Sequence, residues 1–305
     1  MYLINKNKIK SIIRDNSDDI AFIIGNGINY HFNKQNSSWE DLLLFLWSKH
    51  TFETKSFIPP GISFTEFYDA LEIQNYSKNN FSGELQKDVK DRMANWIANK
   101  EQNIILNEIK SLNSPVLTTN FDDQIPRSLN LDFHKMTDTK FTDYYPWSCY
   151  YSSHPQQFPE DGFGVWFLNG MIKYHRSIKL GLSQYMGNVE RARKLIHEKP
   201  ENISFEGKNR NFWSGHKTWL HILFNKSLFI FGLGLDENEI FLRWLLIERA
   251  KYFRKFTDRK HKGWYLMKTD EQAKNNIGKK FFLESVGIEV LEVKDYNTIY
   301  EDIWI

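Results

Sequence analysis

Pro115-Val116-Leu117-Thr118-Thr119-Asn120-Phe121-Asp122 is the stretch that decides the fold. It begins as a short apolar run and ends in polar side chains that can bind a nucleotide. Two glycine motifs follow apolar runs in the same way: Gly25-Asn26-Gly27-Ile28-Asn29 and Gly232-Leu233-Gly234-Leu235-Asp236. Because the carboxyl ends of parallel strands meet at one edge of a sheet, these motifs predict a nucleotide pocket there.

Six short apolar runs predict strands that are buried on both faces. They cover residues 20–24, 115–117, 165–168, 228–231, 264–267 and 288–291. Helical spacing separates them, over residues 6–16, 42–47, 64–71, 85–98, 104–112, 240–251 and 271–285. This alternation predicts an α/β fold, a Rossmann-like parallel sheet with flanking helices and right-handed crossovers.

The chain reads as one domain that spans residues 1–305, without an internal repeat or a low-complexity linker. Residues 52–112 and 184–223 are mostly helical in pattern. We expect them to form a smaller helical layer or subdomain packed beside the sheet.

Composition excludes several classes of protein. Lys+Arg 40 against Asp+Glu 38 argues against a dedicated nucleic-acid binder, so we interpret the basic stretches 6–10 and 249–262 as solvated helix faces. A single cysteine, Cys149, excludes a disulfide within the chain and a four-cysteine zinc module, and we expect no metal. The apolar runs are too short to span a membrane, and residues 1–14 lack the apolar core of a signal peptide. We therefore expect a cytoplasmic protein.

Each glycine motif allows two interpretations. Glycines directly after a strand let backbone amides approach a phosphate, yet residues 25–27 also suit an ordinary strand-to-loop turn. Gly232 and Gly234 allow close approach to a ribose or an adenine. Asp236 more simply caps the helix that begins near Asn238.

The polar residues at 118–122 are more specific. Hydroxyls of Thr118 and Thr119 can bond phosphate or ribose oxygens, and the Asn120 amide can hold a water or a ribose hydroxyl. Asp122 can fix a neighbouring backbone or hydroxyl group. A helix cap would explain one such residue, but four in succession after a buried strand favour a site.

The three motifs, in this order, resemble the SIR2-like (sirtuin-fold) family, and most closely its bacterial antiphage members that consume NAD. The resemblance extends from about Ile20 to Val293 and includes the stretch 180–185. It implies that a phosphate loop, a catalytic asparagine and an adenosine-binding loop are present. The implied NAD-binding residues are Gly25, Asn26, Gly27, Asn29, Thr118, Thr119, Gly170, Gly232, Gly234 and Asp236, and the implied catalytic residues are Asn120, Asp122 and Asn169.

Two positions depart from the family pattern. The zinc module of the protein deacetylases is excluded by the single cysteine, which argues against deacetylation. The family's His-Gly pair reads Asn169-Gly170, and asparagine cannot take up a proton as histidine can near neutral pH. Either the general base is missing or another residue supplies it. We interpret the nearest histidines, His154 and His175, as surface or structural residues.

The resemblance implies an NAD glycohydrolase that depletes NAD during phage infection. Nicotinamide leaves through an oxocarbenium-like transition state, so positioning and electrostatic stabilisation can drive the reaction. Asn120 would hold the attacking water while Asp122 orients the loop. Such an activity must be gated, by self-assembly, by a nucleotide signal or by a separate sensor protein. Asn169 leaves open an impaired subunit that binds NAD or ADP-ribose in a defence complex, and another nucleotide-processing enzyme is a third possibility.

Overall fold

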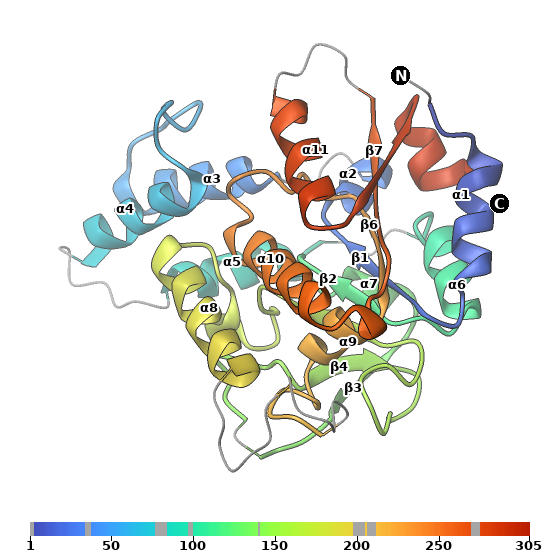
Figure 1. Cartoon of the computed structure of the whole chain (residues 1–305). Helices are drawn as coiled ribbons and strands as arrows, with labels where there is room; N and C mark the ends of the chain where they lie inside the picture. Colours follow the sequence, from blue (N-terminus) through green and yellow to red (C-terminus); the bar gives the residue numbers. More distant parts are fainter. Residues whose placement is uncertain are drawn as a thin grey trace.

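An eight-stranded sheet forms the centre of the molecule, in the order β3-β4-β5-β2-β1-β6-β7-β8 (Figure 1). The computed structural model describes residues 3–33, 38–76, 84–96, 100–139, 141–197, 205, 212–269 and 275–305. The strands are β1 (Ile20–Ile24), β2 (Val116–Thr118), β3 (Asp132–Lys135), β4 (Cys149–Ser152), β5 (Val165–Phe167), β6 (Ser227–Phe231), β7 (Gly263–Lys268) and β8 (Glu289–Val293).

The helices surround this sheet (Figure 1). They are α1 (Lys6–Asp15), α2 (Gly27–Phe32), α3 (Trp39–Thr51), α4 (Phe64–Tyr76), α5 (Glu84–Ala94), α6 (Asn103–Ser111), α7 (Gln124–Ser128), α8 (Leu182–His197), α9 (Trp219–Asn225), α10 (Ile240–Lys255) and α11 (Asn275–Ser285), with short helical turns η1 (His175–Ser177), η2 (Thr257–Arg259) and η3 (Thr298–Asp302). Parts of the predicted helices 85–98 and 271–285, and of the stretch 184–223, lie outside the described residues.

The parallel part of the sheet has the Rossmann strand order. In chain order its strands are β1, β2, β5, β6, β7 and β8, and in space they run β5-β2-β1-β6-β7-β8. This is the 3-2-1-4-5-6 arrangement, whose order reverses between β1 and β6. All six predicted strands are present, so the predicted α/β class is confirmed.

Sequence patterns missed the two antiparallel strands, β3 and β4, which extend the sheet beyond β5. Strand β3 reads Asp-Phe-His-Lys and is half-buried to exposed along its whole length. An edge strand of this kind carries no continuous apolar run, because only one of its sides is hydrogen-bonded and neither face is deeply buried.

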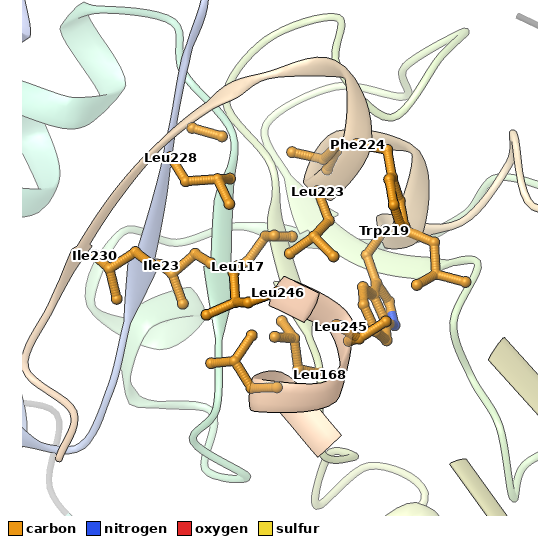
Figure 2. Packing of buried hydrophobic residues seen from close by; sticks show 14 of the residues in the cluster. Ile23, Leu117, Leu168, Trp219, Leu223, Phe224, Leu228, Ile230, Leu245 and Leu246 are labelled. Carbon is orange, nitrogen blue, oxygen red and sulfur yellow. The ribbon is translucent and has the colours of Figure 1, made fainter. Parts of the chain in front are cut away.

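Alternate side chains of the central strands enter two separate cores. Ala21 and Ile23 of β1 pack in the core under α9 and α10, whereas Phe22 and Ile24 pack in the core under α1 and α6. Figure 2 shows the first core, in which Leu223 of α9 and the neighbouring α10 leucines meet the strand residues. This two-sided burial explains why the strands read as uninterrupted apolar runs.

A third core joins α3, α4 and α5 into a helical layer beside the sheet. It also takes in Ile172, Ile178 and Leu180, which follow β5. The helical layer differs from the predicted stretch 52–112 in two helices. Helix α6, within that stretch, packs on the sheet, whereas α3, which precedes residue 52, belongs to the layer. The layer therefore adjoins the loop after β5.

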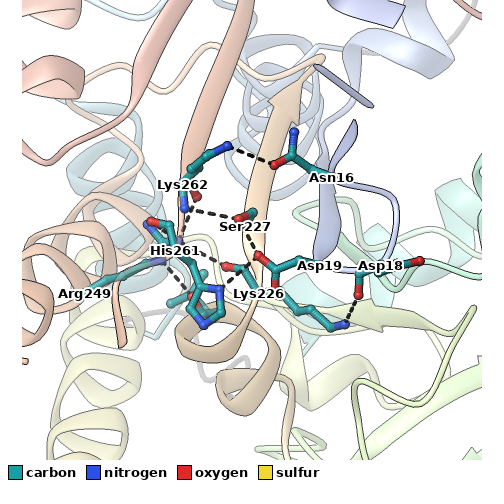
Figure 3. A network of polar contacts seen from close by, with 9 residues as sticks. Asn16, Asp18, Asp19, Lys226, Ser227, Arg249, His261 and Lys262 are labelled. Carbon is teal, nitrogen blue, oxygen red and sulfur yellow. Dashed lines mark hydrogen bonds and ion pairs between the residues drawn. The ribbon is translucent and has the colours of Figure 1, made fainter. Parts of the chain in front are cut away.

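The amino ends of β1, β6 and β7 are joined by a polar network (Figure 3). Asp19 accepts hydrogen bonds from Ser227 at 2.6 Å and His261 at 3.0 Å. Arg249 is 2% exposed and donates to four backbone carbonyls, of Leu223, Lys226, His261 and Lys262. The interpretation of residues 249–262 as a solvated face is thus wrong for Arg249.

None of the helices in the described part of the chain combines the length and apolar character that a membrane span requires.

Candidate functional site

Four loops lie in a row at the carboxyl edge of the sheet, after β5, β2, β1 and β6. Backbone hydrogen bonds join neighbours: Leu168 N donates to Thr118 O at 2.9 Å, and Thr119 N donates to Ile24 O at 3.3 Å. Gly27 N donates to Gly232 O at 2.6 Å. The fold therefore gathers the predicted motifs at the edge where Rossmann sheets bind their ligands.

The glycine motifs after β1 and β6 pack directly on each other. A Cβ atom on Gly27 would lie 2.7 Å from the carbonyl oxygen of Gly232, and one on Gly25 would lie 2.5 Å from the same oxygen. Glycine is required here because one backbone approaches another. The Gly27 amide is already bonded to Gly232, so these residues form the contact between the loops after β1 and β6.

The loop after β2 is held by Thr118. Its hydroxyl donates to Ile24 O at 2.9 Å and accepts from Asn120 N at 3.1 Å, which fixes the backbone that carries Asn120. Asn120 is 6% exposed, and its Nδ2 has no hydrogen-bond partner among the described residues. A buried amide donor without a partner is costly, which makes Asn120 the side chain best suited to a ligand or a water.

Asp122 connects this loop to the motif after β1. Its Oδ2 accepts from Asn29 Nδ2 at 3.1 Å and its Oδ1 accepts from Gln124 N at 3.0 Å. Asn29 Nδ2 also donates to Asn26 Oδ1 at 3.1 Å. Burial raises the pKa of Asp122 to about 6, although hydrogen bonding to Gln124 opposes the shift. The carboxyl group is therefore positioned by the fold and titrates close to neutrality.

The loop after β5 folds back on itself. Asn169 is 4% exposed, and its carbonyl accepts from Lys179 N at 3.0 Å. Gly170 has φ +101° and lies against the backbone of Ser177 and Ile178, where a Cβ would overlap the Ser177 carbonyl. Ile172 N donates to Phe121 O at 2.9 Å, so this loop is attached to the Asn120 loop.

Gly234 and Asp236 form hydrogen bonds with Tyr265 of β7 and with Asn238 before α10. Gly234 O accepts from the Tyr265 hydroxyl at 3.1 Å, and Asp236 Oδ1 accepts from Asn238 N at 2.9 Å. Asn238 Oδ1 in turn accepts from Phe64 N at the start of α4. Asp236 therefore forms a turn before α10; because the helix begins at Ile240 with Glu239 at its N-cap, the expected helix cap at Asp236 is wrong.

Of the two nearest histidines, only His175 belongs to this row of loops, because η1 is part of the loop after β5. His154 is exposed after β4, and His175 in η1 faces the charges of Lys87 and Lys90 on α5. Burial is the largest cause that lowers the pKa of His175.

Two titratable groups near the edge were missed by sequence reasoning. Burial lowers the pKa of Lys179 to about 7, and burial with the nearby Asp236 raises the pKa of Glu239 to about 7. Lys179 stands between apolar residues in Ile178-Lys179-Leu180, and this interruption of an apolar run is the signal that was available.

At the carboxyl edge Asn120, Asp122 and Asn169 are all buried, whereas Gly234 of the loop after β6 is exposed. Two open cavities, of about 420 and 490 Å³, lie at the amino edge, beside α1 and beside the starts of β1 and β2. Within the described ranges, no group of three His, Cys, Asp or Glu side chains is placed to hold a metal ion.

Comparison with known proteins adds no family assignment: no family model matches the chain, and no curated protein matches it significantly.

Proposed function

We propose that the chain is an NAD glycohydrolase that cleaves NAD to nicotinamide and ADP-ribose, and that it acts in the cytoplasm as a gated antiphage effector. The observation that carries the proposal is the buried Nδ2 of Asn120, without a partner among the described residues, at the carboxyl edge of a Rossmann-ordered sheet. The resemblance of residues 118–122 to the SIR2-like motif supplies the substrate class.

In this proposal the residues of the chain act by position. Asn120 holds the attacking water against C1′ of the nicotinamide ribose, and Thr118 fixes the backbone that carries it. Asp122 locks the same loop to Asn29. Most of the rate acceleration then comes from orientation and electrostatic stabilisation of the oxocarbenium-like state.

The buried site supports the gated part of the proposal. Because Asn120 and Asn169 are both buried, we expect NAD to reach them only after the edge opens. Self-association or a separate sensor protein would supply the free energy for that opening, since a partner that binds the open form shifts the equilibrium toward it.

The test is nicotinamide release by the purified full chain, alone and with the proteins encoded beside it. Asn120→Ala should lower the rate by about 10²–10³-fold. Asn107→Ala, an exposed position on α6, is the matched control and should leave the rate unchanged. Equal rates for Asn120→Ala and the wild type would contradict the proposal.

A second candidate is a non-catalytic subunit that binds NAD or ADP-ribose within a defence complex. Asn169 favours it, because an amide at that position can bond a ribose hydroxyl but cannot accept its proton. NAD binding by calorimetry, with no nicotinamide released under any condition, would select this candidate.

A further inference from the structure

The helical layer of α3, α4 and α5 contacts two loops of the candidate site directly. Phe121 packs against the apolar core of this layer. Its neighbours in the chain, Asn120 and Asp122, are the buried polar residues of the loop after β2. Ile172, in the loop after β5, belongs to the same core, and its amide donates to Phe121 O at 2.9 Å. The layer therefore packs on the residue that separates Asn120 from Asp122.

Few polar contacts attach the layer to the helices beside it. Asn238, which precedes α10, accepts a hydrogen bond from Phe64 N at the start of α4, at 3.0 Å. Asp69 of α4 accepts from the amide and the hydroxyl of Ser183 on α8, at 3.1 and 3.0 Å. The Ser183 bonds are exposed to solvent, so water can replace them at little cost.

The surfaces that meet here also leave polar atoms without partners. Trp39 Nε1, Asp69 Oδ1 and Asn120 Nδ2 are buried and have no hydrogen-bond partner among the described residues. The Trp39 ring lies 6.4 Å from the ring of Tyr185 on α8, and a Cβ atom on Gly181 would overlap Asp69 Oδ1. A buried polar atom without a partner is costly, and separation of the two surfaces would return these atoms to water.

The helices of the layer are held to one another more extensively than to the rest of the molecule. Their apolar side chains form a core of their own, in which the rings of Trp47 and Phe67 lie 4.8 Å apart. His50 of α3 and Asp88 of α5 add a polar contact at 2.7 Å. In Figure 1, α3 and α4 lie at one side of the molecule, away from the strands. The layer is thus built to move as one body.

We propose that the helical layer is a lid, which separates as one body from the loops after β2 and β5 and so exposes Asn120. The loop that carries Asn120 stays on the sheet, because Thr118 is bonded to Ile24 O and Asp122 to Asn29. The opening is a property of the fold, whereas its effect on nicotinamide release rests on the proposed function. A partner that binds the open form shifts the equilibrium toward it.

The experiment removes contacts that attach the layer and follows amide hydrogen exchange of residues 118–122 in the full chain. Asn238→Ala and Ser183→Ala each remove one hydrogen bond to α4, and neither residue belongs to the layer. Each change should speed this exchange about 5-fold, and the double variant about 25-fold, with nicotinamide release rising by the same factors. Ser111→Ala, the matched control, removes one hydroxyl bond on α6 and should leave the exchange unchanged. Thermal denaturation verifies that each variant folds.

The outcomes separate the lid from the hydrolase. Faster exchange confined to the loops after β2 and β5, with β1 and α10 unchanged, supports the lid. Unchanged exchange in the double variant overturns the lid, and nicotinamide release that depends on Asn120 would still leave the hydrolase in place. Faster exchange of β1 to the same extent shows a general loosening and also overturns the lid. Faster exchange confined to the loops, without nicotinamide release in any variant, keeps the lid and overturns the hydrolase.

Discussion

Replacing Gly170 with alanine should destabilise the protein severely. The backbone there has φ +101°, which costs an L-residue about 1–2 kcal/mol. The new Cβ would overlap the Ser177 carbonyl and come within 2.7 Å of Ile178 N. Moving that packed backbone adds about 1–3 kcal/mol. We therefore expect a loss of about 3 kcal/mol in the free energy of unfolding.

Two other glycines provide matched controls. Gly287 has φ +78° with no atom within 4 Å of its Cβ position, so Gly287→Ala should cost about 1–2 kcal/mol through strain alone. Gly278 is exposed on α11 with open space around it, so Gly278→Ala should gain about 0.5–1 kcal/mol. Thermal denaturation should separate the three, since 1 kcal/mol moves the midpoint by about 2–4 °C in a protein of this size. Equal midpoints for Gly170→Ala and Gly287→Ala would refute the close packing of the loop after β5.

Three further changes follow from burial. Arg249→Met leaves four carbonyls without their guanidinium donor and should lower the free energy of unfolding in urea by about 3 kcal/mol; a loss below about 1 kcal/mol would contradict the network. The pKa of Asp122 rises from 3.8 to about 6 on folding, so the folded state holds a proton that the unfolded chain has lost, and stability falls as pH rises through this window. Asp122→Asn should abolish that fall and add up to about 3 kcal/mol at pH 7, whereas an unchanged pH slope would exclude the effect. Burial raises the pKa of Cys149 to about 12, so alkylation at pH 8 should require unfolding, and rapid labelling of the folded protein would disprove it.

The sequence predicted the elements in which nearly every residue is apolar because the whole element is buried. Five of the six parallel strands, β1, β2, β5, β6 and β7, are buried on both faces, so they are mostly continuous apolar runs, whereas β8 at the sheet edge has Glu289 exposed. Strand β3 carries no such signal because Asp132 and Lys135 are exposed at the sheet edge. The helical layer was placed only approximately, since helical spacing shows that a face is buried but not which neighbour buries it.

The same limit applies to the candidate site. Polar residues after strands locate Asn120, Asp122 and Asn169 at one edge, because strand topology alone brings them together. The pattern of apolar and polar residues does not predict contacts between segments that are distant in the sequence. The approach of Gly27 to Gly232, and the burial of Lys179 and Arg249, depend on such contacts. Sequence alone therefore predicts a charged residue to be exposed, even where tertiary packing buries it.

The network around Arg249 has a consequence for how the molecule opens. Arg249 binds backbone carbonyls at the starts of β6 and β7, and the Asp19 side chain joins the start of β1 to both, whereas at the opposite edge Asn120 Nδ2 is buried without a partner among the described residues. Amide hydrogens of these three strands should therefore exchange with solvent only on global unfolding, while those of the loops after β2 and β5 should exchange through smaller openings. The sheet is therefore held together at its amino edge, so the loops at the carboxyl edge, which are proposed to bind NAD, can open locally while the strands remain paired.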